Sequence, residues 1–306
     1  MRIPLLPTLC LFAASVFFLP ARGQSLSQLL KKLSTATTDS ERADLYYSLS
    51  TRYWTGNTDS LLLLADLSLQ AAKRDGYEKG VALALLSKGI GFGAKQEYSE
   101  ALNCYLQALR ISEQLKMDGL RSNLYDDMGN VYSHLKDYSR ATEYHQDALK
   151  IAQRNGDRHE TAVLLANIAE NYKNMGAYDS ALAYNVRALP IMESLHDSVV
   201  IAIILLNTGD DYNKKGQPEK ALPYFQRCDA MAQRIGDAED IAWSAVSVAD
   251  SYRRQRRYAL SIRQARAALD SARRLDLGEL IEECYSVLYS AYRENGDFRQ
   301  ALDYRN

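Results

Sequence analysis

Few stretches of this 306-residue chain have the composition of a chemical site. The stretch GIGFG at residues 89–93 resembles a phosphate-binding loop in its glycine content. Such a loop follows a strand and continues into Lys-Ser or Lys-Thr, and neither accompanies this stretch. We predict no nucleotide or other cofactor, and we expect Gly91 and Gly93 to mark either a close approach of backbone or ligand or a soft helical turn.

The histidines and cysteines offer no arrangement for catalysis. The sequence His159-Glu160 lacks the second histidine that a zinc peptidase helix carries four residues after the first. There is no Gly-x-Ser-x-Gly elbow, and no Cys/His pair is spaced to meet. The four histidines do not share a helical face: His134, His145, His159 and His196. We therefore predict no metal site, no catalytic residue and no enzyme activity in these residues; a catalytic domain would have to lie beyond Asn306.

The clearest pattern is a repeat of forty residues that begins near Val81. A small residue is followed three positions later by an aromatic residue, which places both on one face of a helix. The small column is Gly89, Gly129, Ala169, Gly209 and Ala249, and the aromatic column is Phe92, Tyr132, Tyr172, Tyr212, Tyr252 and Tyr292. Each small residue would let a neighbouring helix approach, and each aromatic would fill the space beside it.

A second half of each repeat follows a short polar turn. It has an aromatic residue with a small residue three positions on, as in Tyr138 and Ala141, and another small residue at Ala148. No Val/Ile/Thr-rich alternation suggests a strand. The pattern predicts an all-α fold of two antiparallel helices per repeat. Pro218 suits the first turn of its helix, whereas Pro190 and Pro223 fall inside predicted helices and should bend them.

These columns resemble the tetratricopeptide repeat, in a forty-residue form instead of the commoner thirty-four. The resemblance implies a right-handed α-solenoid of antiparallel helix pairs. We expect a signal peptide at 1–23, an N-terminal helix and degenerate capping repeat at 24–80, and an array over 81–306. Its repeats are 81–120, 121–160, 161–200, 201–240 and 241–280, with a partial repeat at 281–306.

In tetratricopeptide arrays the first helix of each pair lines a concave groove. Here the columns that would face the groove carry amides and charges of both signs, which indicates a protein or peptide ligand of mixed charge. A solvated face with same-helix ion pairs is the alternative. The predicted ligand-binding residues are Asp127, Asn130, His134, Asn167, Glu170, Lys173, Asn207, Asp210, Lys214, Asp250 and Arg254.

Charge helps to limit the class of partner. The formal net charge of −1 provides no long-range attraction for nucleic acid or anionic membranes. Residues 241–280 contain eight arginines against four acidic residues. This repeat would suit an acidic partner or the acidic repeat of a second copy in a homodimer, unless it is simply a solvated face. We expect no nucleic-acid binding through this region.

The N-terminus indicates export. Arg2, an apolar run from Ile3 to Leu19, and small residues at Ala21 and Gly23 form a secretory signal with cleavage before Gln24; an uncleaved anchor is the alternative. We expect an exported, periplasmic or extracytoplasmic protein. Three widely spaced cysteines then remain, Cys104, Cys228 and Cys284, which we interpret as small core residues and not as a disulfide framework.

The stretch from residue 37 to residue 80, followed directly by the array, is similar to the extracytoplasmic sensor regions of bacterial membrane signalling proteins. In those proteins a membrane helix and a histidine kinase or helix-turn-helix regulator follow the array. The resemblance implies a sensing role, with membrane attachment only through a segment beyond Asn306. A free-standing periplasmic adaptor or chaperone-like scaffold is the alternative function.

Overall fold

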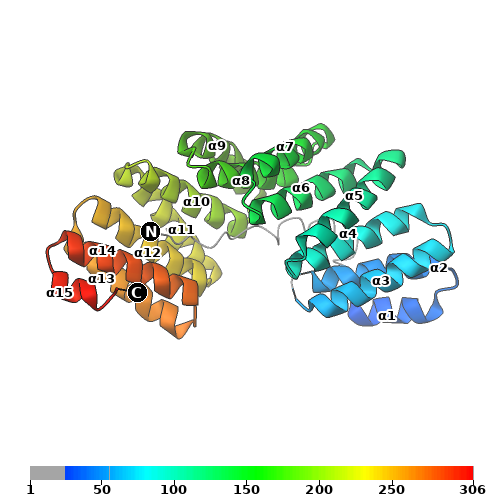
Figure 1. Ribbon diagram of the computed structural model, residues 1–306, viewed down its shortest axis with the longest axis horizontal. Coiled ribbons are helices and arrows are strands. Elements are labelled where there is room, and N and C mark those ends of the chain that lie inside the picture. The colour runs from blue at the N-terminus through cyan, green and yellow to red at the C-terminus, as the bar shows by residue number, and fades with distance from the viewer. Residues whose placement is uncertain (1–24, 55, 306) are drawn as a thin grey trace. The chain divides into compact units, whose positions relative to one another are not determined.

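The computed structural model describes residues 25–54 and 56–305, so the predicted signal peptide lies outside the described residues. The described residues form fifteen α-helices and one short 3-10 helix, with no strand among them (Figure 1). Successive helices are joined by short turns and run back and forth as antiparallel pairs. The predicted all-α solenoid of helix pairs is confirmed.

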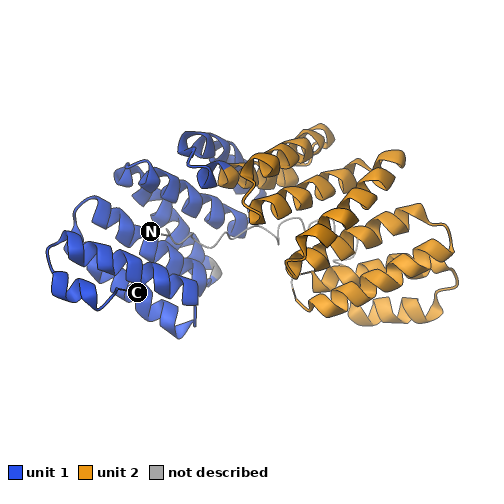
Figure 2. Cartoon of the chain, in the orientation of Figure 1, with its two compact units in different colours: residues 1–9, 172–306 blue, residues 10–171 orange. Residues whose placement is uncertain are grey.

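The chain divides into two compact units, and the division falls within α8 (Figure 2). The helices of unit 2 are α1 (Leu26–Thr35), α2 (Asp39–Ser50), η2 (Thr51–Tyr53), α3 (Thr58–Arg74), α4 (Glu78–Ala94), α5 (Tyr98–Gln114), α6 (Asp118–His134), α7 (Tyr138–Asn155) and most of α8 (Arg158–Asn174). Those of unit 1 are the end of α8, α9 (Tyr178–Leu195), α10 (Ser198–Lys214), α11 (Pro218–Ile235), α12 (Ala238–Arg254), α13 (Tyr258–Arg274), α14 (Gly278–Glu294) and α15 (Phe298–Leu302).

One left-handed residue ends each helix from α3 to α14. These residues have positive φ and recur every twenty positions: Gly76, Gln96, Lys116, Lys136, Gly156, Gly176, His196, Gly216, Gly236, Arg256, Asp276 and Gly296. After each of them the chain makes the same long helix-closing bond, such as the Asp137 amide donating to the Tyr132 carbonyl at 2.9 Å. This hydrogen bond and the left-handed residue together define a Schellman ending. Each forty-residue repeat therefore consists of two twenty-residue units, each made of one helix and the turn that follows it.

Lys136→Gly is expected to stabilise the protein by about 0.5–1 kcal/mol, because Lys136 has φ 62° and an L side chain is disfavoured there. Gly176→Ala, at φ 77°, is the matched control and should destabilise by about 1 kcal/mol. Urea unfolding of both variants measures the difference. If the two substitutions shift stability in the same direction, the left-handed residues do not limit stability.

Glycines in the first helices pack against large rings from the second helices. A methyl group added at Gly89, Gly129 or Gly209 would overlap Tyr105, His145 or Phe225 respectively. Where the small column holds Ala249, the corresponding second-helix residue is Ala265, and both lie in one buried cluster. Size is thus exchanged across the contact: glycine accompanies a ring at these three positions and Ala249 accompanies Ala265, whereas the counterpart of Ala169 is the buried Asn185. Gly91 lies against the Leu62 side chain, so its close neighbour is a side chain and not the backbone or ligand that was expected.

The tyrosines of the aromatic column form stacks within helix pairs. Tyr132 stacks on Tyr144 with ring centroids 5.3 Å apart. The same contact recurs between Tyr172 and Tyr184 and between Tyr212 and Tyr224, each at 5.5 Å, and between Tyr292 and Tyr304 at 5.8 Å. Offset stacking adds to the area that each pair buries. The prediction that this column packs between helices is confirmed.

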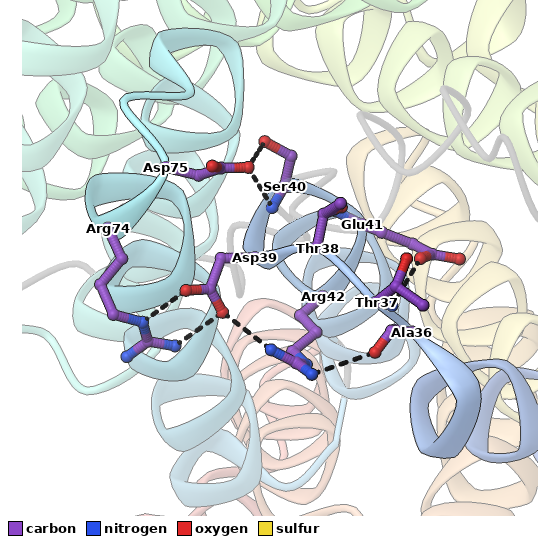
Figure 3. A network of polar contacts seen from close by, with 9 residues as sticks. All are labelled: Ala36, Thr37, Thr38, Asp39, Ser40, Glu41, Arg42, Arg74 and Asp75. Carbon is purple, nitrogen blue, oxygen red and sulfur yellow. Dashed lines mark hydrogen bonds and ion pairs between the residues drawn. The ribbon is translucent and has the colours of Figure 1, made fainter.

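Polar contacts tie the first three helices of unit 2 together (Figure 3). Asp39 in α2 accepts hydrogen bonds from Arg74 Nε of α3 at 2.8 Å and from Arg42 Nη1 at 3.1 Å. Arg42 also donates to the Ala36 carbonyl at the end of α1 (3.0 Å), and Ser40 donates to Asp75 after α3. The two guanidinium groups, Arg74 first, lower the pKa of Asp39. This network supplements the apolar contacts of the same helices, where Leu29, Leu45 and Leu49 form a buried cluster.

The three cysteines of the described region are buried free thiols, as predicted. Cys228 donates to the Ala202 carbonyl at 3.5 Å, and burial raises its pKa to about 12. A thiol with a raised pKa contains little thiolate and reacts poorly.

Pro218 begins α11, as expected, and Pro190 and Pro223 lie inside α9 and α11.

Candidate binding surface on the first helices

In unit 1 the first helices α10, α12 and α14 are neighbours, with α10 contacting α12 and α12 contacting α14. Their side chains form a charged cluster. Asp250 accepts from Arg253 at 2.7 Å and from Arg254 at 2.6 Å, and Arg253 reaches across to Glu294 on α14 at 2.6 Å. Burial opposes ionisation of Asp250, but the two arginines outweigh burial and lower its pKa. The cluster therefore links α12 to α14 through paired charges.

Two carboxyl groups of this cluster lack such close arginine partners. Burial raises the pKa of Asp210 to about 6, although Lys173, Lys214 and Arg254 act against it. Burial raises the pKa of Glu283 to about 7, and the negative charges of Asp250 and Asp210 add to this effect. Carboxyl groups with raised pKa values gather at functional sites more often than elsewhere. They would respond strongly to a cation brought by a ligand.

The two lysines of the cluster differ in exposure and in hydrogen bonding. Lys173 donates to Asn207 at 2.8 Å and is half-buried. Lys214 is exposed and has no ion-pair or hydrogen-bond partner within the described part of the chain. Six predicted site residues thus meet in unit 1 on neighbouring helices: Lys173, Asn207, Asp210, Lys214, Asp250 and Arg254. Arg253 and Glu294 lie in the columns that the sequence places toward the groove, although they are not among the predicted site residues, whereas sequence reasoning missed Glu283.

The predicted site residues of unit 2 lie in a different environment. The expectation that these columns are exposed is wrong for Asp127, Asn130 and Asn167, which are only 3–4% exposed, and also for Asp210 in unit 1, which is 9% exposed. Asn167 donates to Asp126 at 3.0 Å, so its amide is used between α6 and α8. His134 is half-buried, stacks on Tyr98 with centroids 5.8 Å apart, and has a pKa lowered by burial. Glu170 is half-buried.

A buried polar network joins α6, α7 and α8 in unit 2. Ser133 donates to Asn171 at 2.7 Å, and the Asn171 amide contacts His145 Nδ1 at 3.0 Å. His145 Nε2 lies 3.5 Å from Asp126 Oδ1. Burial lowers the pKa of His145 to about 4 and raises that of Asp126. The hydrogen bonds of the network link Ser133, Asn171 and His145 Nδ1. Because burial favours the neutral forms of His145 and Asp126, their 3.5 Å contact is not a charged pair.

Several arginines of residues 241–280 already contact acidic or tyrosine side chains of this chain. Arg253 and Arg254 pair with acids as described above, Arg257 lies 4.9 Å over Tyr252, and Arg273 donates to the Tyr285 hydroxyl at 3.0 Å. Arginine over an aromatic face gains a cation–π attraction. Much of the positive surplus of residues 241–280 therefore stabilises tyrosine packing. Arg263 is exposed and remains available to a partner.

A pocket that sequence reasoning missed lies in unit 2 among the first helices α2, α4 and α6. Its volume is about 400 Å³, and its lining residues are Tyr47, Lys79, Leu83, Leu86, Met117, Asp118, Gly119, Leu120 and Asn123. Its walls are mainly apolar, so the polar columns of the repeat do not reveal it.

Two further features concern metal binding and membrane crossing in the described residues. No group of three or more histidine, cysteine or acidic side chains there is arranged to hold a metal ion. None of the helices between residues 25 and 305 combines the length and the apolar character that a membrane crossing requires.

Antiparallel helix pairs with identical Schellman endings, stacked through small and aromatic columns, define an α-solenoid of helix-turn-helix repeats. The family profile described as tetratricopeptide repeat matches residues 120–194, 166–234 and 200–274, which together cover just over half of the chain. The chain belongs to the tetratricopeptide repeat family. A comparison with curated protein sequences finds no match.

Solved structures share the fold at low sequence identity. NprR in complex with its cognate peptide NprX has a TM-score of 0.62 at 17% identity, covering 95% of this chain and 85% of that one. A Rap protein complexed with Competence and Sporulation Factor has a TM-score of 0.56 at 14% identity, covering 96% and 95%. Aspartyl phosphate phosphatase F from Bacillus subtilis has a TM-score of 0.61 at 16% identity, covering 79% and 73%. These similarities concern the fold.

Proposed function

We propose that this protein is a peptide-binding scaffold whose ligand lies along the first-helix face of unit 1. The observation that carries the proposal is the charged cluster on α10, α12 and α14, where paired arginines stand beside two carboxyl groups of raised pKa and the free Lys214. A ligand with charges of both signs could exchange partners with this cluster. Support comes from the complexes of NprR with its peptide NprX and of a Rap protein with Competence and Sporulation Factor, which share the fold.

The proposal keeps all eleven sequence-predicted residues as candidates but separates their roles. Five of the six in unit 1 are exposed or half-buried and would contact ligand directly, whereas the buried Asp210 would act through the charges beside it. Glu170 and His134 in unit 2 are accessible enough to do so, whereas the buried Asp127, Asn130 and Asn167 would act by holding α6 and α8 in place. An uncompensated buried polar group is costly, so truncating these three should reduce stability before it reduces affinity.

Charge reversal at Lys214 tests the site. Peptides selected from a random library on the full chain are the probes, and their dissociation constants are measured by titration. Lys214→Glu should weaken the best binders about tenfold or more, because it replaces an attractive contact by a repulsive one. Arg234→Glu on the second helix α11, also exposed and unpaired within residues 25–305, is the control and should leave affinity unchanged. Equal effects at both positions would move the site away from the first-helix face.

We further propose that the scaffold is the extracytoplasmic sensing part of a membrane signalling protein. Ligand contacts would favour one arrangement of the helix stack over another, and a ligand can shift such an equilibrium only by its difference in affinity for the two states. A free-standing periplasmic adaptor is the alternative. The signal peptide predicted at residues 1–23 and the similarity noted for residues 37–80 support this setting.

Cell fractionation and N-terminal sequencing of the exported protein test the location, with Gln24 as the expected first residue. The coding sequence downstream of Asn306 separates the two settings: a membrane helix followed by a regulator supports the sensor, and a stop codon supports the adaptor.

Sedimentation of the protein and of Arg263→Glu tests whether residues 241–280 join two copies.

A further inference from the structure

The pocket among α2, α4 and α6 in unit 2 has the dimensions of a ligand site. Its volume of about 400 Å³ lies within the range of about 300–1,000 Å³ typical of small-ligand pockets. Leu86 and Leu120 form buried walls at 1% and 7% exposure, and the half-buried Leu83 and Met117 complete the apolar lining. An apolar group that leaves water for this space would gain about 25 cal/mol per Å² of buried area.

The charges at the rim of the pocket are unequal. Asp118 is already satisfied, since it accepts from Arg121 Nη1 at 3.0 Å and from Arg154 Nη2 at 2.7 Å. Lys79 is exposed and has no ion-pair partner among the described residues. Lys79 is therefore a rim cation without an ion-pair partner in the described part of unit 2. An anionic group on the ligand would complement it.

The side-chain amide of Asn123 helps to distinguish between ligands that combine an apolar part with an anionic group. Asn123 lies in the pocket wall on α6 and is half-buried, and its side chain makes no hydrogen bond to another described residue. An asparagine side chain both donates and accepts hydrogen bonds, which matches a peptide backbone unit with its N–H and C=O. A simple fatty acid has no such pair to offer. The lining thus fits a peptide segment better than a lipid.

We propose that this pocket binds one large apolar side chain of a peptide ligand, with an acidic residue beside it in contact with Lys79. Asn123 would hold the intervening peptide unit. The inference deepens the proposed function and rests on it. It assigns a second contact, with its own sequence preference, to a part of the chain where the predicted polar residues are mainly buried.

Methionine methyl signals report directly on the pocket. Met117 lies in its wall, whereas Met175 is 41% exposed and lies outside the lining. The probes are acetyl-Phe-Asp-amide, acetyl-Phe-Lys-amide and acetyl-Gly-Asp-amide, titrated into the full chain carrying 13C-methyl methionine. The Met117 signal should shift most with acetyl-Phe-Asp-amide, and that probe should bind about threefold more tightly than acetyl-Phe-Lys-amide. The probe without an aromatic ring should produce no saturable shift.

Lys79→Glu should reverse the preference, so that acetyl-Phe-Lys-amide becomes the tighter probe. Lys73→Glu, at an exposed lysine on the second helix α3, is the matched control and should keep the original order. Absence of a Met117 shift up to about 10 mM probe, or a shift equal to that of Met175, would overturn the proposal. If Lys214→Glu still weakens the selected peptides in that case, the pocket is wrong while the proposed function stands.

Discussion

Phe225→Ala is expected to destabilise unit 1 by about 3–5 kcal/mol. The ring is fully buried and covers Gly209, where no side chain could fill the space that it would leave. Loss of the ring therefore removes apolar area and creates a cavity between α10 and α11. Urea unfolding followed by circular dichroism measures the change, with the slope of the transition showing whether unit 1 still unfolds cooperatively.

The double variant Gly209→Ala/Phe225→Ala tests the size exchange itself. Gly209→Ala alone should cost about 1–3 kcal/mol, because the added methyl group overlaps the ring. Combined with Phe225→Ala, the methyl group fills part of the cavity, as at Ala249 and Ala265, so the double variant should be more stable than the sum of the single changes. Gly278→Ala is the control, since its added methyl group meets open space. Additive costs would show that the two positions do not pack against each other.

Glu283→Gln should stabilise the protein at pH 8 by roughly 1–3 kcal/mol and have little effect at pH 4.5. Burial, with Asp250 and Asp210 nearby, raises the pKa of Glu283 to about 7 from its ordinary 4.5. Above pH 7 the folded protein must hold this carboxylate charged in an unfavourable site, although Lys214 and Arg253 offset part of the cost. A neutral glutamine removes that cost.

The direction of the pH dependence follows from proton binding. Between about pH 4.5 and pH 7 the folded state holds a proton on Glu283 that the unfolded state has lost, so the contribution of Glu283 to stability falls as pH rises. The difference between variant and wild type should therefore grow across this window and level off above it. Glu282→Gln, on an exposed neighbour, is the control. A constant difference from pH 4.5 to pH 8 would contradict the assignment.

The helix pairs could be predicted from the sequence because their signal is local and repeated. A small residue three positions before an aromatic one, as in Gly129 and Tyr132, specifies one helical face, and several copies in register leave little room for another fold. The glycine-to-ring pairing was not predicted, since it compares residues sixteen positions apart, as in Gly209 and Phe225, on two helices whose crossing must be known first.

The candidate site was only partly predictable for a related reason. Helical periodicity places Asn130, Asn167 and Asp210 on one side of the first helices, but it does not say how deeply neighbouring first helices enclose them. Asn167 reaches Asp126 from the next repeat, which a single-helix pattern cannot reveal. The apolar pocket depends on side chains from three helices, so no single repeat contains its signature.

The regular helix endings have a consequence for how such a chain can change in length. Left-handed residues stand every twenty positions from Gly76 to Gly296, so any segment between two of them that are forty apart begins and ends in the same conformation. Unequal recombination between two repeats of the gene would add or remove whole repeats while leaving every junction intact. A single inserted codon, in contrast, would displace all later contacts in its helix by about 100°, since an α-helix has 3.6 residues per turn. The chain can therefore gain or lose repeats far more readily than residues.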